Sequence, residues 1–72
     1  MEIELLIEGG KYPIRVKSEM SSSGKVNYYS EYLGSTISAF PAHKRFKGDS
    51  IEESIQLIAT DLQKAIRELM EQ

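Results

Sequence analysis

The first 17 residues constrain the fold more than any other part of the chain. Apolar and charged side chains alternate on both sides of Gly9-Gly10, with the two-residue period of half-buried strands. The two glycines can adopt the positive φ values of a tight hairpin turn. A turn there predicts three apolar cross-strand pairs, Ile7–Tyr12, Leu5–Ile14 and Ile3–Val16, and three ion pairs, Glu8–Lys11, Glu4–Arg15 and Glu2–Lys17. Residues 2–17 are therefore predicted to form an antiparallel hairpin with one buried face.

Two further strands are predicted in the middle of the chain. Residues 25–33 are rich in β-forming side chains, and residues 36–40 follow a two-residue turn at Gly34-Ser35. This turn would place Tyr32 opposite Ile37 and Tyr29 opposite Phe40. The serine-rich loop at residues 21–24 allows more than one register, so the sequence leaves open which tyrosines face inward.

The C-terminal third predicts one long helix. Ser50-Ile51-Glu52-Glu53 is a capping box, in which Ser50 accepts a hydrogen bond from the backbone N–H of Glu53. Apolar residues then repeat at three- and four-residue spacing, as on the buried face of a helix. No proline or glycine follows Gly48, so the helix can continue to the last residues.

These elements predict a single α+β domain over residues 1–72. Its sheet is a four-stranded antiparallel meander, with residues 44–47 as an optional short fifth strand, and the helix packs on one face. The predicted core consists of Ile3, Leu5, Ile7, Ile14, Val16, Ile37, Ile51, Ile55, Ile58, Leu62 and Leu69.

Composition narrows the functional classes. The net charge is −2, the chain has no cysteine and one histidine, and no apolar run approaches the ~18 residues of a membrane span. We therefore expect a cytoplasmic protein with no metal, cofactor or membrane partner. A 72-residue chain buries a small core, which favours stabilisation by association with itself or with another protein.

No set of residues predicts an enzyme or a site for a small-molecule substrate. His43 lies in a basic loop without a second histidine or an acidic pair, which a general base would need. Glu52 and Glu53 belong to the first turn of the helix, where they interact favourably with the helix dipole.

Two groups of residues are candidates for binding. If the middle strands pair as predicted, Tyr29, Leu33 and Phe40 lie together on the sheet face opposite the helix, as an aromatic patch suited to a protein partner or a homodimer. The basic stretch His43, Lys44, Arg45, Phe46 and Lys47 combines cations with an aromatic ring, as in weak RNA-binding surfaces.

Residues 26–70 resemble the HicB-like family, the antitoxin side of HicA/HicB toxin–antitoxin pairs. The likeness lies in Gly34-Ser35 after a tyrosine-bearing strand, in Ala39-Phe40-Pro41, and in residues 48–54, Gly-Asp-Ser-Ile-Glu-Glu-Ser, which open the helix. The resemblance implies a non-enzymatic protein-interaction module, homodimeric or masking a small basic RNA-acting partner. The alternative is a weak RNA-binding module that uses residues 43–47.

Overall fold

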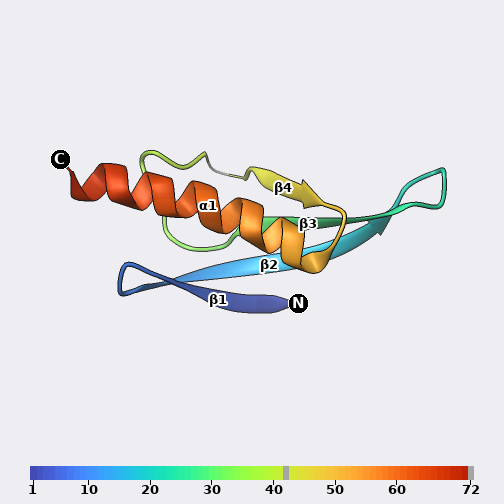
Figure 1. The fold of residues 1–72 in the computed structure, drawn as a ribbon, viewed down its shortest axis with the longest axis horizontal. Helices are drawn as coiled ribbons and strands as arrows, with labels where there is room; N and C mark the ends of the chain where they lie inside the picture. Colours follow the sequence, from blue (N-terminus) through green and yellow to red (C-terminus); the bar gives the residue numbers. More distant parts are fainter. Residues whose placement is uncertain (42, 72) are drawn as a thin grey trace.

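The computed structural model describes residues 1–41 and 43–71, as four antiparallel strands followed by one helix (Figure 1). The elements are β1 (Glu2–Ile7), β2 (Gly10–Met20), β3 (Val26–Tyr32), β4 (Arg45–Gly48) and α1 (Ile51–Met70). The strands neighbour one another in the order β1-β2-β3-β4, so β1 and β4 are the two edges of the sheet. The predicted α+β class, a four-stranded meander with a C-terminal helix, is confirmed.

The N-terminal hairpin forms, but its turn lies at Glu8-Gly9. Both residues have positive φ, of 48° and 81°, and Ile7 pairs with Gly10. The predicted register is therefore wrong by two residues: Leu5 lies opposite Tyr12, Glu2 opposite Arg15 and Glu4 opposite Pro13. The predicted faces are right, because a shift of two residues leaves every side chain on its original side of the sheet.

Turn chemistry alone does not select this turn over Gly9-Gly10. A two-residue primed turn strongly favours glycine at its second position, which Gly9 supplies, but the observed turn also places Glu8 at a positive φ that non-glycine residues rarely adopt. Gly10 then becomes a strand residue beneath the Tyr12 ring, where an added Cβ would lie 2.9 Å from the Tyr12 hydroxyl. The second glycine thus accommodates an aromatic ring and is not part of the turn.

The fourth strand is not the predicted one. Residues 36–40 are irregular, and the fourth strand is Arg45–Gly48, which overlaps the segment 44–47 predicted as an optional fifth strand. Phe40 is buried to 6% exposure and stacks on Phe46, with 5.8 Å between ring centroids. Burial of this ring requires the chain to turn inward, as the Phe40 N–H to Ile37 C=O bond of 3.0 Å shows. The predicted Tyr32–Ile37 and Tyr29–Phe40 pairs are consequently wrong.

The position of α1 is fixed by close contacts with β3 and β4. Ser30 on β3 donates a buried hydrogen bond of 2.7 Å to the carbonyl of Ser54. Gly48 on β4 approaches so closely that an added Cβ would lie 2.6 Å from the Ser54 backbone nitrogen. α1 therefore packs on β4 and β3, makes a smaller contact with β2, and leaves β1 largely uncovered (Figure 1).

The core lies between α1 and this face of the sheet. Its buried apolar members are Ile7, Ile14, Val16, Phe40, Phe46, Ile58, Leu62, Ala65 and Ile66. Among the other predicted core residues, Ile3, Leu5, Ile37 and Ile55 are partly buried against this cluster. Ile51 and Leu69 remain 41% and 40% exposed, because they lie near the two ends of the helix.

The start of the helix agrees with the sequence. Ser50 has extended backbone angles and its hydroxyl accepts a hydrogen bond from the Glu53 N–H at 3.1 Å.

No helix in residues 1–41 and 43–71 is long and apolar enough to cross a membrane.

We predict that Gly48→Ala destabilises the protein by about 1–3 kcal/mol, because the new methyl group would meet the helix backbone and force the two elements apart. Lys47→Ala, one residue earlier on the exposed face, is the control and should change stability by about 0.5 kcal/mol or less. Urea unfolding measures both. Equal stability of the two variants would contradict the close packing of β4 on α1.

A second prediction concerns the helix cap. Ser50→Ala should cost about 1 kcal/mol, because the Glu53 N–H loses its acceptor, whereas Ser50→Asp should be nearly neutral. Thermal unfolding of the three proteins measures the difference. An alanine variant as stable as the wild type would show that the cap contributes nothing.

Candidate functional site

The predicted aromatic patch does not exist as one surface. Phe40 lies in the core on the helix side of the sheet, in edge-to-face contact with Tyr32 at 5.8 Å. Tyr29 lies on the opposite face, and Leu33 is 36% exposed just after β3. The assignment of Phe40 to a partner-binding surface was therefore wrong, because residues 36–40 do not pair with β3.

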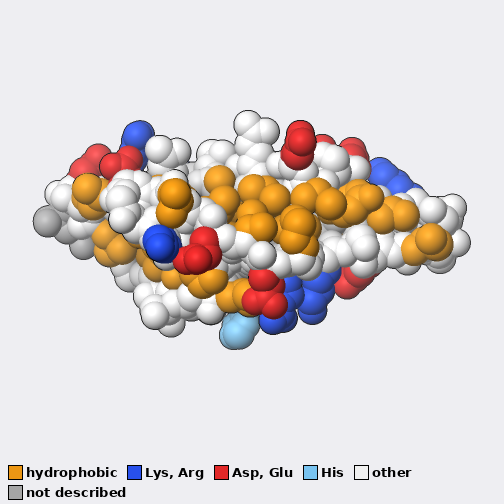
Figure 2. Space-filling model, turned by 90° about the horizontal axis from the view of Figure 1, so that it is seen from below, with side chains coloured by type: hydrophobic (Ala, Val, Ile, Leu, Met, Phe, Trp, Pro, Cys, Tyr) orange, Lys and Arg blue, Asp and Glu red, His pale blue; other side chains and the backbone are white. Residues whose placement is uncertain are grey.

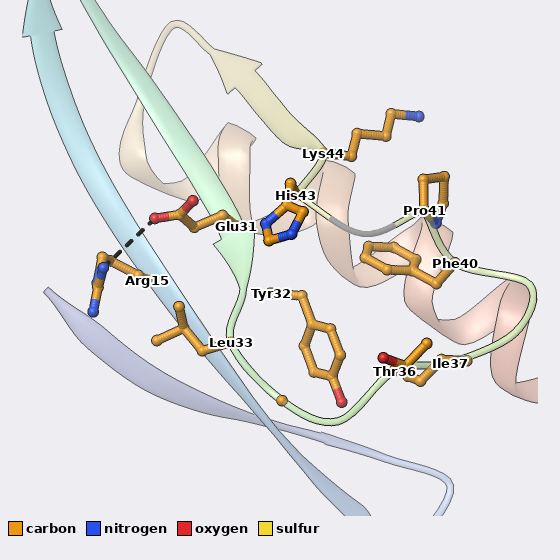
Figure 3. A pocket seen from close by; sticks show the side chains of 11 residues that line it. Arg15, Glu31, Tyr32, Leu33, Thr36, Ile37, Phe40, Pro41, His43 and Lys44 are labelled. Carbon is orange, nitrogen blue, oxygen red and sulfur yellow. Dashed lines mark ion pairs between the residues drawn. The ribbon is translucent and has the colours of Figure 1, made fainter.

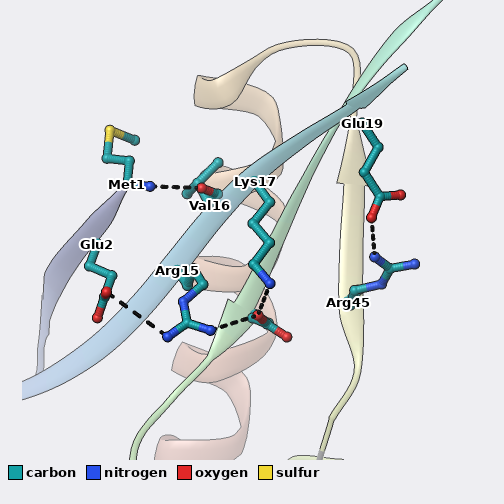
Figure 4. Close-up of polar contacts among 8 residues, drawn as sticks. Met1, Glu2, Arg15, Val16, Lys17, Glu19 and Arg45 are labelled. Atoms are coloured by element: carbon teal, nitrogen blue, oxygen red, sulfur yellow. Dashed lines mark hydrogen bonds and ion pairs between the residues drawn. The ribbon is translucent and has the colours of Figure 1, made fainter. Parts of the chain in front are cut away.

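The face opposite the helix is a network of charged side chains (Figure 4). Glu31 lies 3.8 Å from Arg15 and 3.9 Å from Lys17, and Glu19 bonds Arg45 at 3.0 Å. The Arg45 guanidinium stacks 4.3 Å from the centre of the Tyr29 ring. Opposite charges thus largely neutralise each other on this face, and its tyrosine is covered by a cation.

The basic stretch 43–47 does not present all of its side chains on one surface. As part of β4, Phe46 points into the core and is only 8% exposed, so its ring is not free to stack on a base. Lys44 pairs with Asp61 at 3.6 Å, and Arg45 pairs with Glu19. His43 is exposed with a φ of 62°, and Lys47 lies on the exposed side of β4. This arrangement leaves few free cations for phosphate groups.

A cavity of about 350 Å³ lies between the end of β3 and the loop that leads to β4 (Figure 3). Its walls carry the paired Arg15 and Glu31, the ring of Tyr32, and the side chains of Thr36 and His43. Burial and the neighbouring Tyr12 raise the pKa of Tyr32 above its usual value of 10.0, so its hydroxyl stays protonated at neutral pH.

The acidic side chain in the lining of this cavity is Glu31. Its carboxylate is paired with Arg15 and Lys17. Within residues 1–41 and 43–71, no group of three His, Cys, Asp or Glu side chains is placed to hold a metal ion.

A strip of apolar side chains lies along the β1 side of the molecule. Ile3 and Leu5 on β1 and Ile55 on α1 are partly buried against the core, and Ile51, one helical turn before Ile55, is exposed. We call these four residues the seam. Ile51 and Ile55 belong to the same helical stripe as Ile58, which is fully buried, and the exposure increases towards the start of the helix. Figure 2, viewed from the β1 side, shows apolar side chains in a continuous band with charged groups along both margins.

The seam has a simple geometric origin. A helix is about 10 Å across and strands lie about 4.8 Å apart, so one helix covers roughly two strands. With α1 fixed over β3 and β4, the apolar face of β1 is left at the margin of the core. The sequence contained this signal, because it predicts four strands and only one helix, but it did not indicate which strands the helix covers.

Comparisons with family models, with curated proteins and with solved structures found no match for this chain.

We predict effects of very different size from truncating two aromatic residues that the sequence alone placed on one patch. Phe40→Ala should cost about 3–5 kcal/mol, because it empties part of the core, and Tyr29→Ala about 1 kcal/mol or less. Phe40→Leu, which leaves a smaller cavity, keeps the measurement feasible if the alanine variant unfolds. Urea unfolding that finds Phe40 and Tyr29 equally tolerant would contradict the inward position of Phe40.

Proposed function

We propose that this chain is a non-enzymatic protein-interaction domain that binds another polypeptide along the seam. The single observation that carries this proposal is the band of apolar side chains beside β1 that the helix covers only in part (Figure 2). Ile51 is 41% exposed at one end of this band, and the partly buried Ile3, Leu5 and Ile55 border it. An apolar patch with charged margins on a small monomer is typical of a protein-binding surface.

The resemblance to HicB-like antitoxins supports the same class of function. It suggests either a second copy or a small basic RNA-acting protein as the partner. The acidic residues of β1, Glu2 and Glu4, lie next to the seam and would attract a basic surface. We therefore propose that the domain acts as a cytoplasmic antitoxin-like protein.

RNA binding through residues 43–47 is the weaker alternative. Phe46 is buried, and Lys44 and Arg45 already pair with acidic side chains, so the segment offers few free groups. With few phosphate contacts, binding at physiological salt would be weak.

The proposed function predicts that Ile51→Lys abolishes association with the partner. The domain is co-expressed with the protein encoded beside it, and self-association is followed separately by light scattering. Leu57→Lys is the matched control: Leu57 is 42% exposed on the same helix but is not aligned with the stripe that forms the seam. Both variants should keep the helical circular dichroism signal, because both side chains are largely at the surface.

Loss of the complex in Ile51→Lys but not in Leu57→Lys would support the seam. An unchanged complex in Ile51→Lys, or a chain that associates with neither itself nor its neighbour, would contradict the proposed function.

A further inference from the structure

We propose that the free edge of β1 pairs with the free edge of β4 in a second copy, so that the chains join head to tail through a continued antiparallel sheet. This names the partner for the protein-binding side of the domain, and it rests on the function proposed above. Four complementary properties of the two edges carry it: main-chain phase, side-chain charge, strand direction and the apolar layer.

The main-chain groups of the two edges have matching phases. Met1 and Val16 exchange two hydrogen bonds. The Val16 N–H donates to the Met1 carbonyl at 2.8 Å, and the Met1 amino group donates to the Val16 carbonyl at 3.0 Å, as Figure 4 shows. Bonded and non-bonded pairs alternate in an antiparallel ladder, so Glu2, Glu4 and Leu6 direct their N–H and C=O groups to the free edge of β1.

The same alternation fixes the outer edge of β4. The Leu33 N–H donates to the Pro13 carbonyl at 2.9 Å, which sets the phase between β2 and β3. Carried through the observed registers, this phase directs the main-chain groups of Arg45 and Lys47 away from β3. Each edge therefore has free main-chain donors and acceptors at alternate residues.

Among the registers that match both main-chain phases, one pairs both glutamates of β1 with both basic residues of β4. It places Glu2 opposite Lys47 of the second copy, Ile3 opposite Phe46, and Glu4 opposite Arg45. The outward-directed residues of β1 then meet those of β4, and two opposite-charge pairs lie on the sheet face away from the helix. Phe46 lies on the helix side and would pack beside Ile3, which extends the apolar layer at the exposed margin of the seam.

The number of strands determines the direction in which β4 of the second copy runs relative to β1. Adjacent strands alternate in direction, so in a four-stranded meander the two edge strands run in opposite directions. A second copy placed beside the first in the same orientation therefore presents β4 antiparallel to β1. Its helix then lies on the same side of the sheet as α1, next to the seam.

Pairing of β1 with β1 of another copy is unfavourable by comparison. In antiparallel registers centred on Ile3 or Glu4, a glutamate of one copy lies opposite a glutamate of the other. In the register centred on Leu5, Glu2 lies opposite Glu8. Like charges at directly opposite positions destabilise strand pairing, so the acidic edge selects a basic one.

The existing contacts of these side chains are compatible with the new pairs. Glu2 lies 4.0 Å from Arg15 with its side chain 67% exposed, and Arg45 bonds Glu19 at 3.0 Å with its side chain 48% exposed. No ion pair of Lys47 or of Glu4 is found within residues 1–41 and 43–71. Such pairing is heterologous and does not close by two-fold symmetry, so it produces open chains of increasing length.

The test is a charge exchange followed by sedimentation velocity of the full chain over a range of concentrations. The wild type should show an average mass that rises with concentration beyond that of a dimer. Glu2→Lys and Lys47→Glu should each weaken association about three- to tenfold, because a favourable pair becomes a repulsive one. The double variant, which exchanges the two charges, should recover most of the wild-type association.

Two matched controls change the same charges elsewhere. Glu68→Lys and Lys64→Glu, on the exposed side of α1, should leave association unchanged. Hydrogen exchange supplies a structural readout: the amides of Glu2, Glu4, Arg45 and Lys47 should become protected only as concentration rises.

A wild type that stays monomeric at high concentration would overturn the edge pairing, as would a double variant no stronger than either single one. If the domain is monomeric but still binds the neighbouring gene product through Ile51, the edge pairing fails while the proposed function stands. Failure of both measurements would reject both.

Discussion

The structure depends on the close contact of one helix with two strands. A hydrogen bond from the buried Ser30 hydroxyl to the Ser54 carbonyl, and the absence of a side chain at Gly48, hold α1 over β3 and β4. A helix of ordinary width covers only about two strands, so this choice decides which part of the sheet is left at the margin. The partly covered apolar strip beside β1 follows from that choice, and it is a consequence of packing more than of any local feature of β1.

The N-terminal hairpin illustrates what sequence periodicity can and cannot determine. Alternation assigns each side chain to a face, and that assignment holds for Ile3, Leu5 and Ile7. Periodicity alone does not distinguish registers that differ by two residues, because both keep the same faces. The complementary charges around Gly9-Gly10 favoured the wrong register, since exposed cross-strand ion pairs contribute only tenths of a kcal/mol. In the register that forms, Glu8 takes the first turn position and Gly10 lies beneath the Tyr12 ring.

The prediction of the fourth strand was wrong for a different reason, and the same reason removes the predicted aromatic patch. Residues 36–40 have acceptable strand propensities, but a buried phenylalanine side chain contributes about 1.5–3 kcal/mol and outweighs them. Phe40 therefore leaves the sheet surface for the core, where it stacks on Phe46. The interface predicted from Tyr29 and Phe40 disappears with it. Strand propensity and turn signals are local properties of the sequence. The position of one large ring depends on the space between the sheet and the helix, which exists only in the folded protein.

The charges on the two edge strands have two consequences for strand pairing. Acidic side chains on β1 and basic side chains on β4 each discourage pairing with an identical edge, which is a common protection of exposed strands. Yet the two sets are complementary to each other, and the observed hydrogen-bond phases bring their free main-chain groups into register. The charges that disfavour the pairing of two identical edges therefore do not disfavour the pairing of β1 with β4 of another copy. Because β4 is only four residues long, that association would be weak enough to respond to concentration and to salt.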